Sequence, residues 1–383
     1  MSFATVRHTL FTVHMWIGLI LGLLLAVLGL SGSLLVYDEA IGDFLEPPPH
    51  AATAGTPLPL SMLAGIARDA AASQGIAGGQ LQLILPEEKT GALVVRIGGL
   101  SVMGNVPAPG GERPARPRQL QIYLDPVSGE VLGTRRAALP GLLTFAHQLH
   151  GNFLISRETG RPIVGWLGVA MCLLGISGLV LWWPKRGQWK YAFKVRRAAT
   201  GLRFHRELHA ATGIWIFLVF MAVSFSGVVI AWPQTMGLAG PSGGQRGMAM
   251  AEPMDTKPLG PTEAVIAAAS AVPDIKPRSI TIPARPGQPI SVNYRSHDAV
   301  NAVVLIDPHS GKLLAVRDES ERFLAWMRPV HDGSLGAVWR FLVFLSGLVP
   351  TLFVVTGLIM WWKKRQRHVP MTAMSDEIAD DPA

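Results

Sequence analysis

The sequence predicts a membrane protein: a bundle of four transmembrane helices with a pseudo-twofold internal repeat, carrying two small α+β domains between the helices. Two observations lead to this fold class. The chain of 383 residues has a mean hydropathy of +0.32 and only 16% charged residues, which is too apolar for a soluble enzyme of this length. The second half of the chain also repeats the pattern of apolar stretches, histidines and tryptophans found in the first half.

Four stretches of at least 20 residues contain no Asp, Glu, Lys or Arg. They run from Met15 to Tyr37, Ile163 to Trp183, Ala210 to Trp232 and Phe341 to Trp362. A helix of this length spans roughly 30 Å, the thickness of the hydrocarbon core of a bilayer. The first stretch is longer than the apolar part of a signal peptide and no small-x-small cleavage site precedes Asp38, so we expect it to remain as a helix.

The charge of the short loops predicts the orientation of the helices. The loop from Pro184 to His209 holds eight Lys or Arg residues and one acidic residue, Glu207. Such a loop stays in the cytoplasm. Arg7 and the basic run that begins at Lys363 agree, so we expect both termini inside and the two long segments outside. This topology and contact with a lipid bilayer explain the net charge of +8, and no nucleic-acid partner is needed.

The two long segments share one pattern of elements. Each contains a helical pattern, around Leu63 in the first and from Glu263 to Ala271 in the second, followed by strand-like runs. These runs are Leu81 to Leu85, Ala92 to Ile97 and Gln121 to Leu124, and Ser279 to Ile282, Ile290 to Tyr294 and Val303 to Ile306. In both segments an Asp-Pro-x-Ser-Gly turn, beginning at Asp125 or Asp307, precedes a further strand. Two small α+β domains of similar topology are the simplest interpretation.

The predicted parts follow one another along the chain. They are a first transmembrane helix in 1–39, an outer domain in 40–138, an outer amphipathic segment and second helix in 139–183, a basic cytoplasmic loop in 184–209, a third helix in 210–232, a linker and second outer domain in 233–322, an outer segment and fourth helix in 323–362, and a cytoplasmic tail in 363–383.

This combination of motifs resembles the PepSY-associated transmembrane family over nearly the whole chain. The resemblance rests on the Asp-Pro-x-Ser-Gly hairpins, the histidine-bearing first helix, and Leu149-His150-Gly151 followed by Gly178-Leu179-x-Leu181-Trp182-Trp183-Pro184. It implies PepSY-like outer domains, a bacterial inner membrane, b-type haem and, among some members, ferrisiderophore reductase activity. The second copy departs from the first, because it reads His331-Asp332-Gly333 and has Arg328 at the place of His147.

Two histidine pairs are the candidate haem ligands. His14 is followed at 17 and 18 residues by Ser31 and Gly32, and His209 at the same spacings by Ser226 and Gly227. Polar side chains at membrane depth usually face the interior of a bundle, so we expect the imidazoles of His14 and His209 to bind one haem iron between them. His150 and His331 precede the second and fourth helices, and we expect them to bind a second haem iron on the outer side. The alternative for all four is an interfacial histidine that satisfies backbone or lipid phosphate.

Three further histidines are reserve haem candidates. His147 lies one helical turn before His150 and His205 one turn before His209, so either could share a face with its neighbour. His8 is a similar reserve. His50, His297, His309 and His368 fall in expected loops, turns or the tail and receive no role. Cys172 is the only cysteine, which excludes an attached c-type haem and an iron–sulfur cluster, so any haem must be held without thioether bonds, in agreement with the haem b that the resemblance implies.

We expect the protein to be a ferric-chelate reductase that passes electrons across the membrane to a ferric siderophore or another ferric chelate. Arg96, Arg295 and Asn293 of the outer domains are available to such a chelate. The electron donor is left open between a flavin, a flavoprotein and a quinol, because no Gly-x-Gly-x-x-Gly nucleotide motif lies on the cytoplasmic side. The alternative is a membrane-anchored binding or protease-regulating protein without redox activity. No catalytic side chain is expected in either case.

Overall fold

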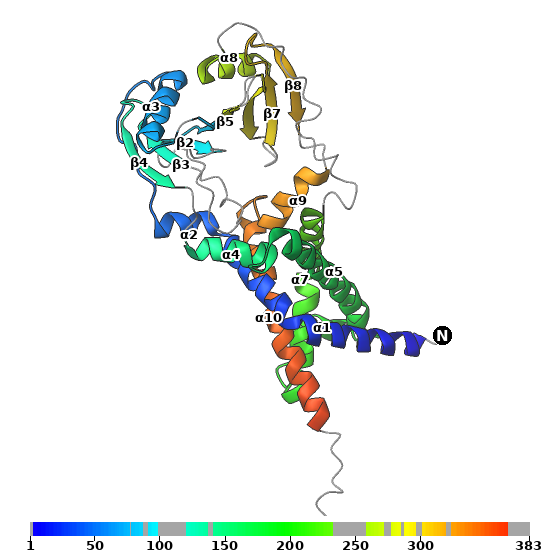
Figure 1. The fold of residues 1–383 in the computed structure, drawn as a ribbon. Coiled ribbons are helices and arrows are strands. Elements are labelled where there is room, and N and C mark those ends of the chain that lie inside the picture. The colour runs from blue at the N-terminus through cyan, green and yellow to red at the C-terminus, as the bar shows by residue number, and fades with distance from the viewer. Residues whose placement is uncertain are drawn as a thin grey trace, which may run out of the picture. The chain divides into compact units, whose positions relative to one another are not determined.

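A computed structural model describes residues 3–76, 78–86, 91–98, 120–136, 141–232, 258–271, 277–284, 287–295, 301–318 and 323–366. These residues form two compact units, one of long helices and one built around a β-sheet (Figure 1). Both halves of the chain contribute to each unit.

Four long apolar helices form the first unit. They are α1 (Phe3–Leu35), α5 (Arg157–Trp182), α7 (Gly201–Ala231) and α10 (Ala337–Gln366), and each is long and apolar enough to cross a membrane. The four transmembrane helices predicted from the charge-free stretches are therefore confirmed. Each helix begins before its charge-free stretch, and α10 also continues beyond it, so charged residues such as Arg7 and Lys364 belong to the helices.

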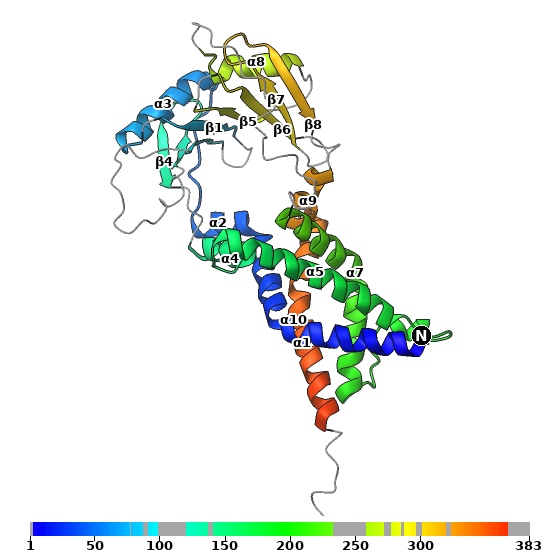
Figure 2. The same cartoon turned by 45° about the vertical axis from the view of Figure 1, so that its right-hand side comes forward.

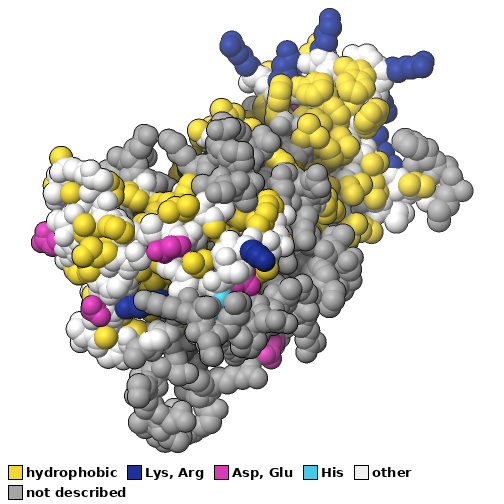
Figure 3. Space-filling view, turned by 90° about the horizontal axis from the view of Figure 1, so that it is seen from above, with side chains coloured by type: hydrophobic (Ala, Val, Ile, Leu, Met, Phe, Trp, Pro, Cys, Tyr) yellow, Lys and Arg dark blue, Asp and Glu magenta, His cyan; other side chains and the backbone are white. Residues whose placement is uncertain are grey.

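The helices pack in a closed ring in which α1 contacts α10 and α5, and α7 contacts α5 and α10. Small residues allow the closest approach: a Cβ atom on Gly29 would collide with the carbonyl oxygen of Gly347, and the Ser33 hydroxyl donates to the Phe344 carbonyl at 2.8 Å. Large apolar side chains cover the outside, and Leu23, Trp215 and Leu218 are each at least 70% exposed. Such a surface suits lipid rather than water. Figure 3 shows Lys and Arg side chains at the border of a continuous hydrophobic surface.

Two short helices lead into α5 and α10. Helix α4 (Gly141–Asn152) precedes α5, and α9 (Phe323–Asp332) precedes α10. After α4 the chain turns through Phe153 and Leu154, whose φ angles are 52° and 63°. After α9 it turns through Gly333 with a φ of 85°, a conformation that glycine adopts without strain. These turns fix the last residues of α4 and α9, where His150 and His331 lie. Two other short helices are α2 (Asp38–Leu45) and α6 (Trp189–Ala192).

The second unit contains one antiparallel sheet with the strand order β4-β3-β2-β1-β5-β6-β7-β8 (Figure 2). The strands are β1 (Gln80–Ile84), β2 (Leu93–Gly98), β3 (Leu120–Leu124), β4 (Val131–Arg136), β5 (Pro277–Ile282), β6 (Ile290–Arg295), β7 (Asn301–Ile306) and β8 (Leu313–Asp318). Alternate residues of β1, β2 and β3 form a core with α3 (Leu60–Ser73), and those of β5, β6 and β7 form a core with α8 (Pro261–Ala271).

The two outer segments are joined in a way that the sequence did not predict. Each half supplies a helix and four strands in the predicted order, but β1 pairs with β5, with Leu83 opposite Ile280. The described strands therefore form one continuous eight-stranded sheet rather than two separate sheets. The backbone groups along β1 and β5, which would be exposed at the edges of two smaller sheets, bond to each other.

Candidate cofactor site

His14 and His209 face each other inside the helix bundle and are called the first histidine pair below. His14 lies on α1 and His209 on α7. The centres of their imidazole rings are 6.3 Å apart and the ring planes meet at 74°. Both side chains are half-buried, and the ring of Phe353 on α10 lies 4.5 Å from that of His209. Residues from the two halves of the chain are thus brought together at one point.

Two hydroxyl groups fix the tautomers of the first histidine pair. Nδ1 of His14 lies 2.8 Å from Oγ of Ser177, and the Ser177 hydroxyl donates its proton to the Leu173 carbonyl at 2.7 Å. With its proton directed at Leu173, the serine oxygen offers His14 only lone pairs, which favours the tautomer that has the proton on Nδ1. Nδ1 of His209 is bonded in the same way, at 2.8 Å, to Thr356, whose hydroxyl donates to the Leu352 carbonyl. The lone pair of Nε2 is left available in both rings.

His150 and His331 form the second histidine pair, at the ends of α4 and α9. Their ring centres are 5.9 Å apart. Nδ1 of His150 donates to the Leu28 carbonyl on α1 at 2.9 Å, and Nδ1 of His331 donates to the Val223 carbonyl on α7 at 2.9 Å. A neutral imidazole with a protonated Nδ1 is the form that binds a metal through Nε2.

The spacing within each pair fits two imidazoles on opposite sides of one metal ion. A bond from a metal to an imidazole nitrogen is about 2 Å long and the ring centre lies ~1 Å behind that nitrogen, so the two ring centres are about 6 Å apart. The observed separations are 6.3 and 5.9 Å. Within the described residues, no group of three or more His, Cys, Asp or Glu side chains could hold a metal ion.

The two pairs lie at different depths in the bundle. On α7, 14 residues separate His209 from Val223, whose carbonyl binds His331. At a rise of 1.5 Å per residue this separation is about 21 Å. His14 and Leu28 have the same separation along α1. One pair therefore lies towards each end of a span that is roughly 30 Å long in a membrane.

A cavity of about 1250 Å³ adjoins the first histidine pair. Both imidazoles line it, together with apolar side chains and glycines from all four long helices. The glycines are Gly18, Gly22, Gly175, Gly178, Gly201, Gly213 and Gly357. A Cβ atom on Gly18 or Gly357 would meet nothing within 4 Å, so there is free space beside these two glycines. A flat and largely apolar group fits a cavity of this kind.

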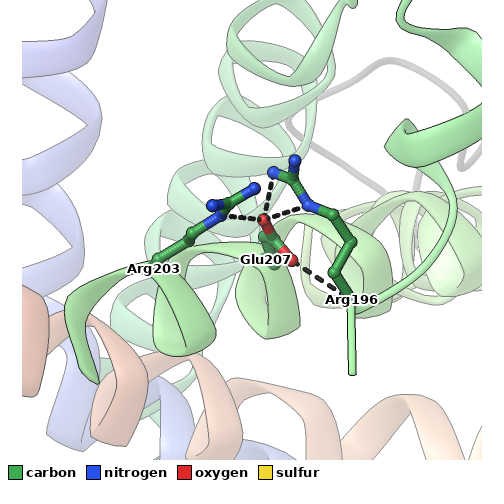
Figure 4. A network of polar contacts seen from close by, with 3 residues as sticks. All are labelled: Arg196, Arg203 and Glu207. Carbon is green, nitrogen blue, oxygen red and sulfur yellow. Dashed lines mark hydrogen bonds and ion pairs between the residues drawn. The ribbon is translucent and has the colours of Figure 1, made fainter. Parts of the chain in front are cut away.

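Basic side chains form one part of the cavity wall. They are Arg7, Arg196, Arg203, Arg206 and Lys364, and none of the described residues that line the cavity is acidic. Figure 4 shows how Glu207 holds two of these cations: Nε of Arg196 donates to its carboxylate at 2.7 Å and Nε of Arg203 at 2.9 Å. The Arg196 backbone N–H also donates to Glu207, at 3.0 Å, which ties the basic loop to α7.

The reserve histidines lie outside the two pairs. His147 is exposed and its Nε2 lies 3.6 Å from a carboxylate oxygen of Asp38. His205 lies edge-on to the neighbouring Phe204 ring, at 5.4 Å between centres. His8 is exposed and lines the cavity. His309 lies in the turn between β7 and β8, whereas His297 and His368 lie outside the described residues.

The sequence identifies the histidines of both pairs but not the side chains and glycines that position their rings. Ser177 and Thr356 immediately precede two similar runs of sequence, Gly178 to Arg186 and Gly357 to Arg365, and this shared position was the available signal. From the sequence, Gly32 and Gly227 are helix glycines that would allow close helix packing or make room for a macrocycle. A Cβ atom on Gly32 would lie 2.7 Å from Cε1 of His150, and one on Gly227 would lie 2.9 Å from Cε1 of His331. These glycines therefore make room for the second histidine pair.

The chain matches a known protein family along most of its length. Residues 11–364 match the family described as the PepSY-associated TM region. No protein with a curated description matches the chain. The match includes all four long helices, both histidine pairs and the sheet, so this chain belongs to the PepSY-associated TM family.

Proposed function

We propose that the protein is a haem-b-dependent reductase of the bacterial inner membrane, which transfers electrons across the membrane to ferric iron in periplasmic chelates such as ferric siderophores. The observation that carries this proposal is the presence of two imidazole pairs at different depths of one bundle, with ring centres 6.3 and 5.9 Å apart and with Nδ1 already bonded. The two halves of the chain would be related by a pseudo-twofold axis along the membrane normal, so that each half supplies one ligand to each pair.

The residues of this chain would bind and orient the cofactor. His14 and His209 would hold one haem iron, and His150 and His331 the other. A haem b iron with two imidazole ligands exchanges single electrons without needing an open coordination position. Ser177, Thr356 and the carbonyls of Leu28 and Val223 would keep each Nε2 directed at the metal, because a hydrogen-bonded Nδ1 prevents the ring from rotating.

The distribution of charge supports an orientation with both termini in the cytoplasm. The connection between α5 and α7 is rich in Lys and Arg, and so is the end of α10. The first histidine pair would then lie towards the cytoplasm, the second pair towards the periplasm, and the sheet in the periplasm. Electrons would enter at the cytoplasmic side from a flavin, a flavoprotein or a quinol.

The chemistry of ferric chelates explains why reduction releases iron. Siderophores bind iron(III) through hard oxygen donors, and iron(II) is a softer ion that these donors hold less tightly. One electron per iron is sufficient. The sheet offers polar groups to such a chelate: Gln121, Arg96, Gln82 and Thr281 are in register across β3, β2, β1 and β5, on the face opposite the cores formed with α3 and α8. Asn293 bonds to Ser279 on the same face, and the side chain of Arg295 lies outside the described residues.

The visible spectrum of full-length protein in detergent tests the proposal. We expect low-spin b-type bands after reduction with dithionite and two haems per chain. His209→Ala should remove one haem and His331→Ala the other, whereas His50→Ala, in a connecting segment of the sheet unit, should remove neither. Protein reconstituted in vesicles with an internal reductant should then reduce an external ferric chelate. A colourless protein would contradict the proposal and favour a membrane-anchored binding protein.

A further inference from the structure

The basic side chains that line the cavity differ in whether they already have a hydrogen-bond or ion-pair partner. Glu207 holds Arg196 and Arg203, and Nη2 of Arg7 donates to the Leu181 carbonyl at 2.8 Å. Arg206 forms no hydrogen bond or ion pair within the part of the chain that the structure describes. Nζ of Lys364 lies 5.5 Å from the centre of the Phe11 ring, and no carboxylate pairs with it among the described residues. Among the described residues, three cations that line the cavity, Arg7, Arg206 and Lys364, therefore have no anionic partner, and only Arg206 and Lys364 of these make no hydrogen bond.

Arg206 and Lys364 lie on the same helix faces as the residues that form the first histidine pair. Arg206 precedes His209 by one helical turn, about 4.5 Å, and both line the cavity. On α10 the cavity is lined by Phe353, Gly357, Met360 and Lys364, which recur every three or four residues and thus form one stripe. The cavity therefore runs from the imidazoles to these two cations.

We propose that Arg206 and Lys364 bind the two carboxylates of the porphyrin that occupies this cavity. The inference rests on the proposed function, since it takes a haem held by His14 and His209 as the occupant. Haem b has a flat apolar body and two propionate carboxylates, which match an apolar cavity with one basic end. A cation close to a low-dielectric region gains most from a bound anion, because water screens it least. A lipid phosphate offers the same negative charge, so the test must distinguish a porphyrin carboxylate from a lipid headgroup.

The experiment compares two porphyrins that differ only in their carboxylates. Full-length apoprotein carrying His331→Ala, which restricts binding to the first histidine pair, is titrated in detergent with ferric protoporphyrin IX and with its dimethyl ester. We expect the free acid to bind about 10- to 100-fold more tightly than the ester. The double variant R206Q/K364Q should lose this preference and keep its affinity for the ester. The matched control R197Q/K363Q removes the same charge from residues that do not line the cavity and should keep the preference.

Potentiometric titration of the two-haem protein gives a second measurement that does not require apoprotein. Removing two cations near one iron disfavours its reduced form, so R206Q/K364Q should lower one midpoint potential and leave the other unchanged. An unchanged preference for the free acid in R206Q/K364Q, or unchanged potentials, would overturn the proposal and leave lipid phosphate as the partner of these cations. Failure of the His331→Ala protein and of the wild type to bind either porphyrin would instead refute the proposed function itself.

Discussion

At the scale of single residues, the hydroxyl groups of Ser177 and Thr356 orient the imidazole rings of the first histidine pair. Each accepts a hydrogen bond from Nδ1 at 2.8 Å. Thr356→Val keeps the shape of the side chain but leaves the Nδ1 proton of His209 without its acceptor. We expect about a 10- to 100-fold loss of haem affinity at the first pair, with the second pair unchanged, in haem titrations that resolve the two sites.

Thr351 provides the matched control for this substitution. It lies on α10 with Thr356, and its hydroxyl is buried without a hydrogen-bond partner among the described residues. Thr351→Val therefore removes the same atoms without removing a bond, and we expect haem binding to stay at the wild-type level. Equal losses in both variants would mean that the bundle tolerates no change on α10 and that Thr356 has no particular role.

Gly32 and Gly227 limit the space around the second histidine pair. A methyl group on Gly32 would lie 2.7 Å from Cε1 of His150, which is too close for any pair of carbon atoms, so the imidazole must move. We expect Gly32→Ala to reduce the haem content from two to one per chain, measured by pyridine haemochrome assay. Gly151→Ala is the control, since it lies beside His150 on α4 and a methyl group there meets nothing within 4 Å. Loss of haem in the control alone would show that steric exclusion at Gly32 is unimportant.

At the scale of secondary-structure elements, the hairpin between β3 and β4 depends on the carboxylate of Asp125. It accepts hydrogen bonds from the Thr53 side chain and from the backbone N–H groups of Ser128 and Val127, which lower its pKa to about 2. An unfolded aspartate has a pKa of about 3.9. The unfolded chain therefore binds this proton more readily, and the stability that Asp125 contributes is present above pH 4 and lost as the pH falls towards 2.

Asp125→Asn tests this contribution. The amide retains one acceptor oxygen but has no charge, so we expect a lower melting temperature of the sheet at pH 7 and a smaller decrease in melting temperature between pH 4 and pH 2 than in the wild type. Circular dichroism of the full-length protein follows the transition. Glu130→Gln, an exposed position in the same turn, should keep the wild-type pH dependence. A wild-type melting temperature that does not change between pH 4 and pH 2 would contradict the assignment.

The same elements show how much the sequence could predict. Charge-free stretches predicted the four long helices because a buried backbone in lipid needs uninterrupted helical hydrogen bonds. Asp-Pro-x-Ser-Gly predicted the hairpins because its hydrogen bonds are local. The pairing of β1 with β5 was not predictable, because alternation decides which face of a strand is buried and not which strand lies beside it. The sequence also did not identify Ser177 and Thr356 as acceptors for the histidines. A hydroxyl in an apolar helix more often bonds to its own backbone, so its presence alone does not predict a partner on another helix.

At the scale of the whole molecule, each of the shared structures requires both halves of the chain. Each histidine pair takes one imidazole from each half, and the sheet takes four strands from each. In the sheet, Leu83 and Ile280 are fully buried and lie opposite each other across the β1–β5 junction, in the core of the first and second half respectively. If the junction is structurally important, the stabilities of the two halves must be coupled.

A double-mutant cycle measures this coupling. Leu83→Ala should cost about 2–5 kcal/mol of unfolding free energy, and Ile280→Ala a similar amount. Because the two side chains are neighbours, the double variant should deviate from the sum of the single effects by about 0.5 kcal/mol or more. The free energies are measured by hydrogen exchange of the strands in the full-length protein, which reports on the sheet without unfolding the helices. Leu83→Ala with Val304→Ala, three strands away on β7, is the control and should be additive. Additive effects in both cycles would mean that the two halves unfold independently and that the shared sheet does not couple them.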